Sequence, residues 1–372
     1  MCGCGGGGKK TICSCCGSIY YQYYDSAVRE VRDMDALGWR IYLRIEKRRV
    51  ACVVCDGVKV ESLDWLADNP RYTSRMAEYV GKLCRQMTNK AVAELLRIDE
   101  EAVKEFDKLY MARLLAKHPI KAVRVLGIDE IAIGKGHTYR VIVSDVERGR
   151  VIWIGGEGRR ECDIDQCFID LGAKKSAGTR LAVMDMWKAF RNSVERHAPQ
   201  AKILYDKFHI LQHLSFAMDE VRRAEYKRVS AQERSFIKGQ RYTLLSHREN
   251  LSAKAKKSLK RLLAINRRLN TAYLLKEEFA QLWDYRSETW ARRFFENWQE
   301  KLRWQRLKPF EKFAAMVEAH WDGIASYYEA ENKVKLGFVE GVNNKVRVIQ
   351  RRAYGYRDEE YMKLKIMTSF LP

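Results

Sequence analysis

Several signals of common protein classes are absent from the 372-residue sequence. No apolar run approaches the ~20 residues that a membrane-spanning helix requires. The opening stretch, MCGCGGGGKKTICSCC, lacks the apolar core of a secretory signal. Neither a G-x4-G-K-[ST] nor a G-x-G-x-x-G pattern follows a predicted strand, so phosphate-binding loops of those kinds are excluded. These absences predict an intracellular protein that acts away from membranes.

Proline is scarce, with 5 in the chain and none between Pro199 and Pro309. Within residues 211–330 the glycines are Gly239 and Gly323. Because Gly and Pro punctuate secondary structure, and a loop of this length is unusual in a compact domain, the segment is predicted to be helical. Its tryptophans are predicted to be core residues, with stacking of one of them on an extruded base as the alternative. They are Trp283, Trp290, Trp298, Trp304 and Trp321.

Basic residues outnumber acidic ones, 69 Lys and Arg against 48 Asp and Glu, which gives a formal net charge of +21. Such a surplus favours a polyanionic partner, and nucleic acid is the commonest one. The alternative is a basic protein without such a partner. No basic amphipathic segment stands apart from the folded pattern, which makes a membrane surface the weaker candidate. The charge therefore predicts a nucleic-acid partner.

Cysteine is concentrated near one end, because seven of the 10 cysteines fall in the first 55 residues. In a reducing compartment this clustering indicates a metal site rather than disulfides. Two C-x2-C pairs, Cys13 with Cys16 and Cys52 with Cys55, offer the four thiolates of a tetrahedral Zn²⁺ site. Unliganded thiols are the alternative. Three neighbouring cysteines leave the choice of ligands open: Cys2, Cys4 and Cys15.

Three consecutive segments between residues 60 and 118 carry apolar residues at helical spacing: SRMAEYVGKLCRQM, TNKAVAELLRID and EEAVKEFDKLYMARLL. Thr88 and Asp99 precede the second and third segments and are predicted to be N-caps. A short helix, a tight turn and a longer helix predict a helix-turn-helix, whose third helix would enter the major groove of DNA. A three-helix bundle with another role is the alternative.

Beyond residue 120, strand-like and helix-like segments alternate. Three strand patterns, VRVLGIDEIAIG, TYRVIVSDV and RVIWIGG, are separated by predicted turns at residues 134–136 and 147–149. A helix (CDIDQCFIDLGAKK), a strand (TRLAVMDMW), a helix (KAFRNSVERHAP) and a strand (AKILYDKFHI) follow. When a three-stranded antiparallel sheet is continued by parallel strands, its first and fourth strands lie side by side. The order therefore predicts one mixed five-stranded sheet.

Carboxylates lie at particular places in this pattern. Asp129 interrupts the first strand and Asp185 ends the fourth, so adjacency of the two strands would bring them together. In a late helix, Val339, Val342 and Val346 mark an apolar face and Glu340 lies on another. If this helix packs across the sheet, Glu340 reaches the same place. Three carboxylates suit Mg²⁺, and two such ions activate a water or hydroxyl and stabilise the leaving oxygen of a phosphodiester.

Each carboxylate also has a simpler explanation. Asp129 would be a turn residue at a strand end, Asp185 would cap the helix that begins near Lys188, and Glu340 would be a solvated helix residue. Glu130 is predicted to face away from Asp129, because successive strand side chains point to opposite faces.

Three segments carry a family resemblance. GIDEIAIGKGHTYRVIVSDVERGRVI, VMDMWKAFRNSVERHAPQAKILYDKFHILQHL and VEGVNNKVRVIQRRAYGYRDEEYMKLKI resemble the signature blocks of bacterial insertion-sequence transposases of the ISL-three family. The C-x2-C pairs and the helix-turn-helix resemble the N-terminal half of that family. The resemblance implies an α/β fold with an RNase H-like catalytic core, a mixed five-stranded sheet with helices, that holds a large all-helical insertion. The implied domains are a zinc-binding module (1–58), a helix-turn-helix (59–118), the first part of the core (119–210), the insertion (211–330) and the last part of the core (331–372).

The resemblance also implies site residues. Asp129, Asp185 and Glu340 match a D-D-E triad, which would hold two Mg²⁺ or Mn²⁺ ions. Asp206 and His209 match a D-x-x-H element, which implies a supporting role. From their spacing alone, Asp206 and His209 are predicted to form a hydrogen-bonded pair at a strand end.

The implied function is that of a DNA transposase that binds the terminal inverted repeats of its element, cuts there and joins the freed 3′-hydroxyl to target DNA. A basic stretch after Glu340 would hold phosphate, or would be a solvated basic face: Lys345, Arg347, Arg351 and Arg352. Pairing of two element ends implies a homodimer or higher assembly on DNA, in the bacterial cytoplasm at the nucleoid. Two alternatives remain: a catalytically silent DNA-binding regulator derived from a transposase, and a general RNase H-like nuclease.

Overall fold

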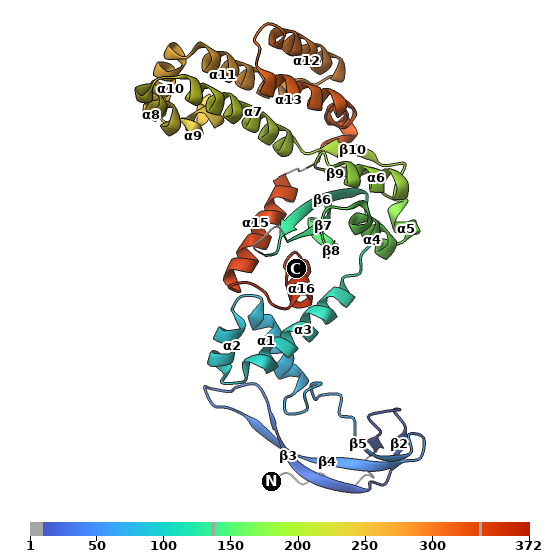
Figure 1. Ribbon diagram of the computed structural model, residues 1–372. Helices are drawn as coiled ribbons and strands as arrows, with labels where there is room; N and C mark the ends of the chain where they lie inside the picture. Colours follow the sequence, from blue (N-terminus) through green and yellow to red (C-terminus); the bar gives the residue numbers. More distant parts are fainter. Residues whose placement is uncertain (1–9, 135–137, 335–336) are drawn as a thin grey trace. The chain divides into compact units, whose positions relative to one another are not determined.

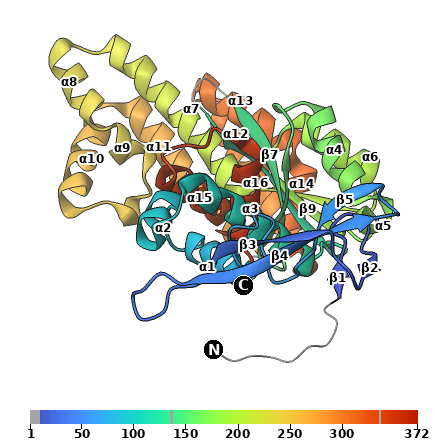
Figure 2. The same ribbon diagram turned by 90° about the horizontal axis from the view of Figure 1, so that it is seen from below.

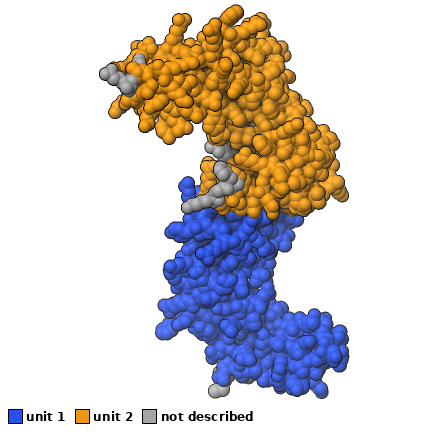
Figure 3. All heavy atoms as spheres, viewed as in Figure 1, with its two compact units in different colours: residues 1–119, 348–372 blue, residues 120–347 orange. Residues whose placement is uncertain are grey.

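The computed structural model describes residues 10–134, 138–334 and 337–372, without the side chains of residues 231–233 and 340. Cys2, Cys4 and most of the predicted turn at 134–136 lie outside the described residues. The chain divides into two compact units, residues 1–119 with 348–372 and residues 120–347 (Figure 3). This boundary falls within helix α15 (Gly337–Arg352), so residues 348–372, which were predicted to belong to the core, group with the N-terminal unit. No helix in the described ranges is long and apolar enough to cross a membrane.

The first unit begins with short strands around a long antiparallel ribbon (Figure 1). β3 (Asp25–Arg32) pairs with β4 (Tyr42–Cys52), and β4 pairs with β5 (Gly57–Val60). β1 (Thr11–Ile12) and β2 (Ile19–Tyr20) form a separate pair. β3 carries no strand pattern in the sequence. Most side chains of β3 are exposed on both faces, so its sequence lacks the apolar alternation that marks a half-buried strand.

Three helices follow, α1 (Ser74–Cys84), α2 (Asn89–Leu96) and α3 (Glu100–Lys117). The predicted N-caps are confirmed: Thr88 Oγ1 accepts from Ala91 N at 3.2 Å, and Asp99 Oδ2 accepts from Glu101 N at 3.0 Å. Arg97, in the left-handed region with a φ of 52°, ends α2 and begins the turn into α3. The three helices bury a common apolar core that includes Met76, Val92 and Phe106.

The C-terminal helix α16 (Glu359–Thr368) completes this unit by packing against α3. Asp107 of α3, 1% exposed, accepts a hydrogen bond from the Tyr361 hydroxyl and lies 2.5 Å from Lys365 Nζ. The ammonium also donates to the Cys84 carbonyl at 2.9 Å. Residues near the end of the chain are therefore part of the helix-turn-helix core.

The second unit is built on a five-stranded sheet with the order β10-β9-β6-β7-β8. Its strands are β6 (Val125–Ala132), β7 (Tyr139–Asp145), β8 (Arg150–Gly155), β9 (Leu181–Met184) and β10 (Lys202–Tyr205). The pairs β6–β7 and β7–β8 are antiparallel, whereas β6–β9 and β9–β10 are parallel. The predicted mixed sheet and the adjacency of its first and fourth strands are confirmed, and the order is that of an RNase H-like core.

Helices cover both faces of this sheet. α4 (Glu161–Leu171) and α6 (Lys188–His197) pack on one face, where Phe168, Phe190 and Val194 bury strand residues such as Ile128. A short helix, α5 (Ala173–Ser176), follows α4. The start of α15 packs on the other face through Val339, so the predicted packing of the late helix across the sheet is observed.

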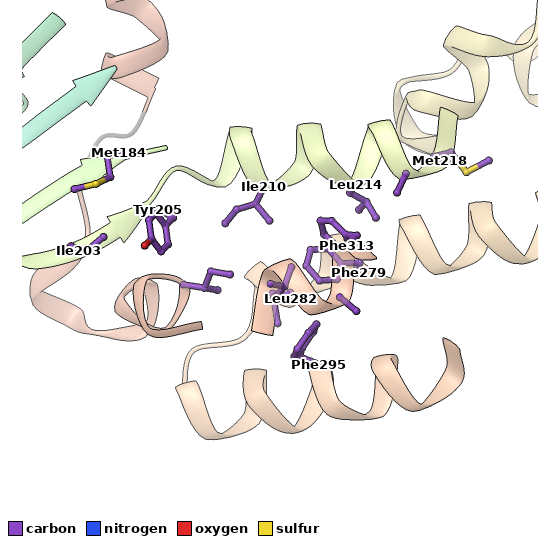
Figure 4. Packing of buried hydrophobic residues seen from close by; sticks show 14 of the residues in the cluster. Met184, Ile203, Tyr205, Ile210, Leu214, Met218, Phe279, Leu282, Phe295 and Phe313 are labelled. Atoms are coloured by element: carbon purple, nitrogen blue, oxygen red, sulfur yellow. The ribbon is translucent and has the colours of Figure 1, made fainter. Parts of the chain in front are cut away.

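Helices account for most of residues 207–332, as the scarcity of proline predicted. They are α7 (Lys207–Arg228), α8 (Ala231–Gly239), α9 (Arg241–Leu245), η1 (Arg248–Asn250), α10 (Ala253–Ile265), α11 (Arg267–Phe279), η2 (Ala280–Asp284), α12 (Glu288–Leu302), α13 (Lys308–Ala319), α14 (Trp321–Ala325), η3 (Ser326–Tyr328) and η4 (Ala330–Asn332). Leu214 of α7 packs near Phe279 and Phe313 in their core (Figure 4). Trp298 is fully buried, whereas Trp290 and Trp304 are exposed, so the tryptophans of this region are only partly core residues.

Candidate functional site

The register of the sheet aligns three carboxylates. Gly127 of β6 lies opposite Val183 of β9, and continuing this parallel register by two residues places Asp129 level with Asp185. Met184 of β9 lies opposite Tyr205 of β10, and one further residue places Asp185 level with Asp206. Asp129, Asp185 and Asp206 therefore form a row across three neighbouring strands, where β9 and β10 end.

Extending the strand alternation by one residue past β9 and β10 puts the three carboxylates on one face of the sheet, and the charges of all three act on His209. The residues two positions earlier in each strand, Gly127, Val183 and Leu204, lie on the face that contacts α15. At two of these positions apolar side chains form a cluster with Val339 of α15, namely Val183 and Leu204. At the third, Gly127, an added Cβ would lie 3.0 Å from Val339 Cγ2. A strand glycine often marks a close approach of another segment, and here it allows α15 to approach β6 beside Asp129.

Asp129 is nearly buried, with 7% of its surface exposed. Its Oδ1 accepts from the Glu130 amide at 2.7 Å, and its Oδ2 accepts from Asn343 Nδ2 of α15 at 2.7 Å. Burial raises the pKa of Asp129, while these hydrogen bonds and the nearby His209 act in the opposite direction. A buried carboxylate of this kind is stabilised by a cation. The sequence analysis did not identify Asn343 as a site residue. The feature that could have indicated it is its position one helical turn after Glu340.

Asp185 is half-buried just beyond β9, and its Oδ1 accepts from the amide of Met186 at 2.6 Å. The N-cap position of α6 is Trp187, and no side chain makes a cap hydrogen bond there. The alternative explanation of Asp185 as a helix cap is therefore wrong, and this carboxylate stays on the face that it shares with Asp129.

Asp206 caps α7, because its Oδ1 accepts from the amide of Phe208 at 2.9 Å. Its Oδ2 lies 3.5 Å from His209 Nδ1, a distance that fits an ion pair better than the predicted hydrogen bond. Burial lowers the pKa of His209, but Asp206 and the charges of Asp185 and Asp129 outweigh it and raise the pKa to about 9. The imidazole of His209 thus faces the row of carboxylates, and their negative charges favour its protonated form.

Glu130 is half-buried and forms an ion pair with Arg159. Burial raises the pKa of Glu130, and Arg159 counteracts this rise. The guanidinium of Arg159 also lies over the rings of Tyr139 and Trp187, 4.9 and 5.6 Å from their centroids. Glu130 therefore has a partner of its own and is distinct from the row of three carboxylates.

The third residue of the predicted D-D-E triad, Glu340, lies in α15 three residues before Asn343, and its side chain is outside the described residues. The predicted phosphate-binding residues are all exposed on the same helix: Lys345, Arg347, Arg351 and Arg352. The first two belong to the second unit and the last two to the first.

The chemistry of the donors around Asp129 fits Mg²⁺. Asp129 and Asp185 supply carboxylate oxygens, and the buried Asn343 Oδ1 has no hydrogen-bond partner. Hard oxygen donors of this kind are what Mg²⁺ prefers, and it retains waters rather than filling its shell with protein ligands. Among the described side chains, these carboxylates do not form a group of three whose ligand atoms all lie within 4.8 Å of one another. Such a group is found in the first unit.

That group is the four cysteines of the two C-x2-C pairs, whose Sγ atoms all lie within 4.8 Å of one another: Cys13, Cys16, Cys52 and Cys55. Ligand sulfurs around a tetrahedral Zn²⁺ ion, at Zn–S distances of about 2.3 Å, have the same order of separation. The Tyr20 hydroxyl, 3.1 Å from Cys52 Sγ, lowers the pKa of that thiol to about 6 and favours its thiolate. Cys15 is exposed and lies outside the group, so the geometry favours the predicted four ligands.

The helix-turn-helix has an uneven charge distribution. The first turns of α3 expose Glu100, Glu101 and Glu105. Lys104 and Lys108, on the same helix, are paired with Asp358, 3.2 and 2.8 Å from its Oδ2. The exposed surface at the start of α3 is therefore acidic, which is unfavourable for phosphate contacts by this part of the helix.

The chain matches known families and proteins along most of its length. A DDE-type model described as transposase matches residues 126–366, one described as the helix-turn-helix domain of transposase family ISL3 matches 61–110, and one described as the zinc-finger of transposase IS204/IS1001/IS1096/IS1165 matches 9–55. The transposase for insertion sequence element IS1001 of Bordetella parapertussis is 33% identical over 365 residues, which cover 97% of this chain and 89% of that protein. The transposase for IS1557 of Mycobacterium tuberculosis is 25% identical over 378 residues, which cover 94% and 83%.

Proposed function

The chain belongs to the ISL3 family of insertion-sequence transposases, and we propose that it binds the terminal inverted repeats of its own element, cuts phosphodiester bonds there with Mg²⁺, and joins the freed 3′-hydroxyl to target DNA. The observation that carries the proposal is the alignment of Asp129 with Asp185 on the sheet face against which α15 packs. That helix contains Glu340, the third member of the proposed D-D-E triad.

Asp129, Asp185 and Glu340 would hold Mg²⁺ or Mn²⁺. Two bound ions supply Lewis-acid activation of the attacking oxygen and stabilisation of the leaving oxygen. The remaining residues position this set. Asn343 fixes the Asp129 carboxylate through its 2.7 Å hydrogen bond. Asp206 and His209 support the row from β10 and α7, because the imidazolium balances part of the negative charge.

Recognition of the element ends is assigned to the first unit, with Zn²⁺ held by its four cysteines. If α3 enters the major groove as the helix-turn-helix architecture implies, its acidic first turn suits base edges rather than phosphates. Carboxylates accept from the amino group of cytosine, which gives Glu100 and Glu101 a role in reading sequence. Phosphate contacts are assigned to exposed cations, among them Lys345 and Arg347.

Assembly and location follow from this chemistry. Joining two ends of one element to a target requires two copies of the active site, so we propose a homodimer or a higher assembly on DNA. The substrate places the protein at the nucleoid in the bacterial cytoplasm.

The test uses labelled duplexes of the inverted repeats that flank the gene, incubated with purified protein with and without Mg²⁺. The expected result is a cut at the element boundary that requires the metal and is lost in Asp129→Asn and Glu340→Gln, while both variants still bind the duplex. Specific binding without cleavage under any metal would indicate a DNA-binding regulator. Cleavage that unrelated DNA competes away equally well would indicate a general nuclease.

A further inference from the structure

The β3–β4 ribbon of the first unit ends in an unusual turn. Ala36 N donates to the Trp39 carbonyl at 3.1 Å, and Trp39 N donates to the Ala36 carbonyl at 2.9 Å, which closes a two-residue hairpin. Both central residues, Leu37 and Gly38, have positive φ, 50° and 80°, as a type I′ turn requires. Figures 1 and 2 show this end of the ribbon projecting from the rest of the first unit. We call residues 36–40 the hairpin tip.

The side chains of the hairpin tip are not those that the turn itself favours. A type I′ turn prefers Asn or Gly at its first central position, because a Cβ is strained at positive φ. Leu37 occupies this position and is 100% exposed, and Trp39 beside it is 76% exposed. Single exposed apolar residues are common on protein surfaces. A leucine at positive φ next to a tryptophan, both largely exposed, instead indicates a contact made by the tip.

The residues just before the hairpin tip are hydrogen-bonded to the helix-turn-helix. Arg32, at the end of β3, is buried and donates to the Asp33 carbonyl at 2.8 Å and to the Leu96 carbonyl, at the end of α2, at 3.4 Å. Asp33 accepts from Thr73 Oγ1 at 2.8 Å and from Arg75 Nε at 2.7 Å, and these two residues begin α1. The base of the tip, at residues 32 and 33, therefore lies beside the helices assigned to end recognition.

Cations line the approach to the tip. Asp35 is neutralised by an ion pair with Arg32. Within the part of the chain that the structure describes, Arg29, Arg40 and Arg44 make no ion pair, and all three are exposed. Unpaired guanidinium groups on a narrow ribbon attract DNA phosphates, and basic side chains beside an apolar wedge are typical of proteins that bind the minor groove.

We propose that the hairpin tip inserts into the minor groove of the element end beside the site of the helix-turn-helix, with Leu37 and Trp39 against the bases and Arg40 against the backbone. This inference rests on the proposed binding of the element ends. Apolar wedges of one or two side chains are sufficient to unstack a base step. A second protein is a poorer fit, because two side chains do not supply the roughly 800 Å² per partner of a standard protein interface.

The test compares the full-length wild type with Leu37→Asn/Trp39→Thr. Asparagine tolerates the positive φ at residue 37, and threonine keeps the strand propensity at residue 39. The matched control is Leu274→Asn/Tyr242→Thr, which removes an exposed leucine and an exposed aromatic side chain from the second unit. Zinc content and thermal unfolding establish that each variant is folded. Affinity for the inverted-repeat duplex is then measured by fluorescence anisotropy across a salt series, with hydroxyl-radical footprints of the complexes.

The double variant at the tip is expected to bind about tenfold or more weakly, with an unchanged salt slope, and to lose minor-groove protection at one location. The slope of log affinity against log salt is negative, and Arg40→Gln is expected to make it less steep by about one. Wild-type affinity and an unchanged footprint for the tip variant, or an equal loss in the control, would overturn the proposal. So would a change from dimer to monomer in the DNA-free tip variant, because the tip would then contact a second copy. Absence of specific binding by the wild type would instead refute the proposed end recognition.

Discussion

At the scale of single residues, the site depends on side chains that position others. Asp129 is buried on the sheet face where α15 packs, and one of its two oxygens accepts from Asn343. Without this hydrogen bond, the Asp129 carboxylate would rotate or take up a proton more readily, since burial already raises its pKa. Asn343 thus belongs to the site although it is outside the D-D-E pattern.

Asn343→Ala is expected to slow cleavage of the element ends by about 10- to 100-fold, as loss of residues that orient metal ligands does elsewhere. The Mg²⁺ concentration for half-maximal cleavage should rise, while affinity for DNA stays unchanged. The rate is measured in a Mg²⁺ titration. Asn344→Ala, at an exposed neighbouring position, is the control. Equal rates for the two variants would remove Asn343 from the site.

The ion pair between Arg75 and Asp33 in the first unit is expected to make the stability of the protein depend on pH. The Arg75 guanidinium, bonded to Asp33, lowers the pKa of this carboxyl to about 2, below the value of about 3.9 in an unfolded chain. A depressed pKa in the folded state stabilises the protein above pH ~4, and the contribution is lost as pH falls toward 2. Wild type and Arg75→Met should therefore differ in free energy of unfolding at neutral pH and converge at acid pH. Denaturant titrations from pH 7 to 2 measure this difference.

The exposed pair of Arg49 with Asp25 supplies the control for that measurement. Because exposed ion pairs contribute little, Arg49→Met should scarcely change stability at any pH. A difference between wild type and Arg75→Met that persists unchanged at pH 2 would refute the assigned role of the Asp33 carboxylate.

At the scale of elements, α16 is a structural part of the helix-turn-helix. Its Lys365 and Tyr361 both contact Oδ2 of Asp107, a carboxylate in the core between α1, α3 and α16. Removing the cation leaves a buried charge unpaired, which is far more costly than loss of a surface ion pair. The family resemblance implied that residues 331–372, and with them this helix, belong to the catalytic core, whereas α16 groups with the first unit.

Lys365→Met is expected to lower the free energy of unfolding of the first unit by about 3–5 kcal/mol. Lys363→Met, which removes an (i, i+4) surface pair with Glu359, should cost about 0.5 kcal/mol or less. Both are measured by urea unfolding. The double variant Asp107→Asn/Lys365→Met should recover part of the loss. If Lys363→Met and Lys365→Met are equally stable, the buried pair does not support α16.

Asp206 combines capping of α7 with its place in the row of carboxylates, and two substitutions separate these roles. Asp206→Asn keeps a good N-cap but removes the charge, so stability should hold while cleavage slows. Asp206→Ala should in addition lower the free energy of unfolding by about 1 kcal/mol. Thermal unfolding and the cleavage rate are measured on both. Full activity in Asp206→Asn would restrict Asp206 to capping.

At the scale of the whole molecule, the division into two units predicts two unfolding transitions. The first unit contains the four-cysteine cluster and the second contains the sheet and the helical region. Because zinc binding contributes directly to the folding of such modules, a chelator should lower one transition and leave the other in place. Calorimetry with and without chelator measures this. Cys52→Ser should lose the bound zinc and Cys15→Ser should retain it; one cooperative transition that the chelator shifts as a whole would contradict this division.

The sequence by itself determined the features that depend on local spacing. Helix periods, strand periods and short motifs depend on residues that are close in the sequence. The sequence therefore predicted the C-x2-C pairs, the N-caps at Thr88 and Asp99, the strands that contain Asp129 and precede Asp185, and the long helical region. The tertiary structure decided what depends on distant segments. Asn343 contacts Asp129, which lies 214 residues earlier in the sequence. Lys365 contacts Asp107, and the whole second unit lies between these two residues in the sequence. The sequence also could not show that Leu37 and Trp39 are exposed. An apolar residue in a sequence is ordinarily predicted to be in the core, and the packing of the fold determines which apolar side chains remain exposed.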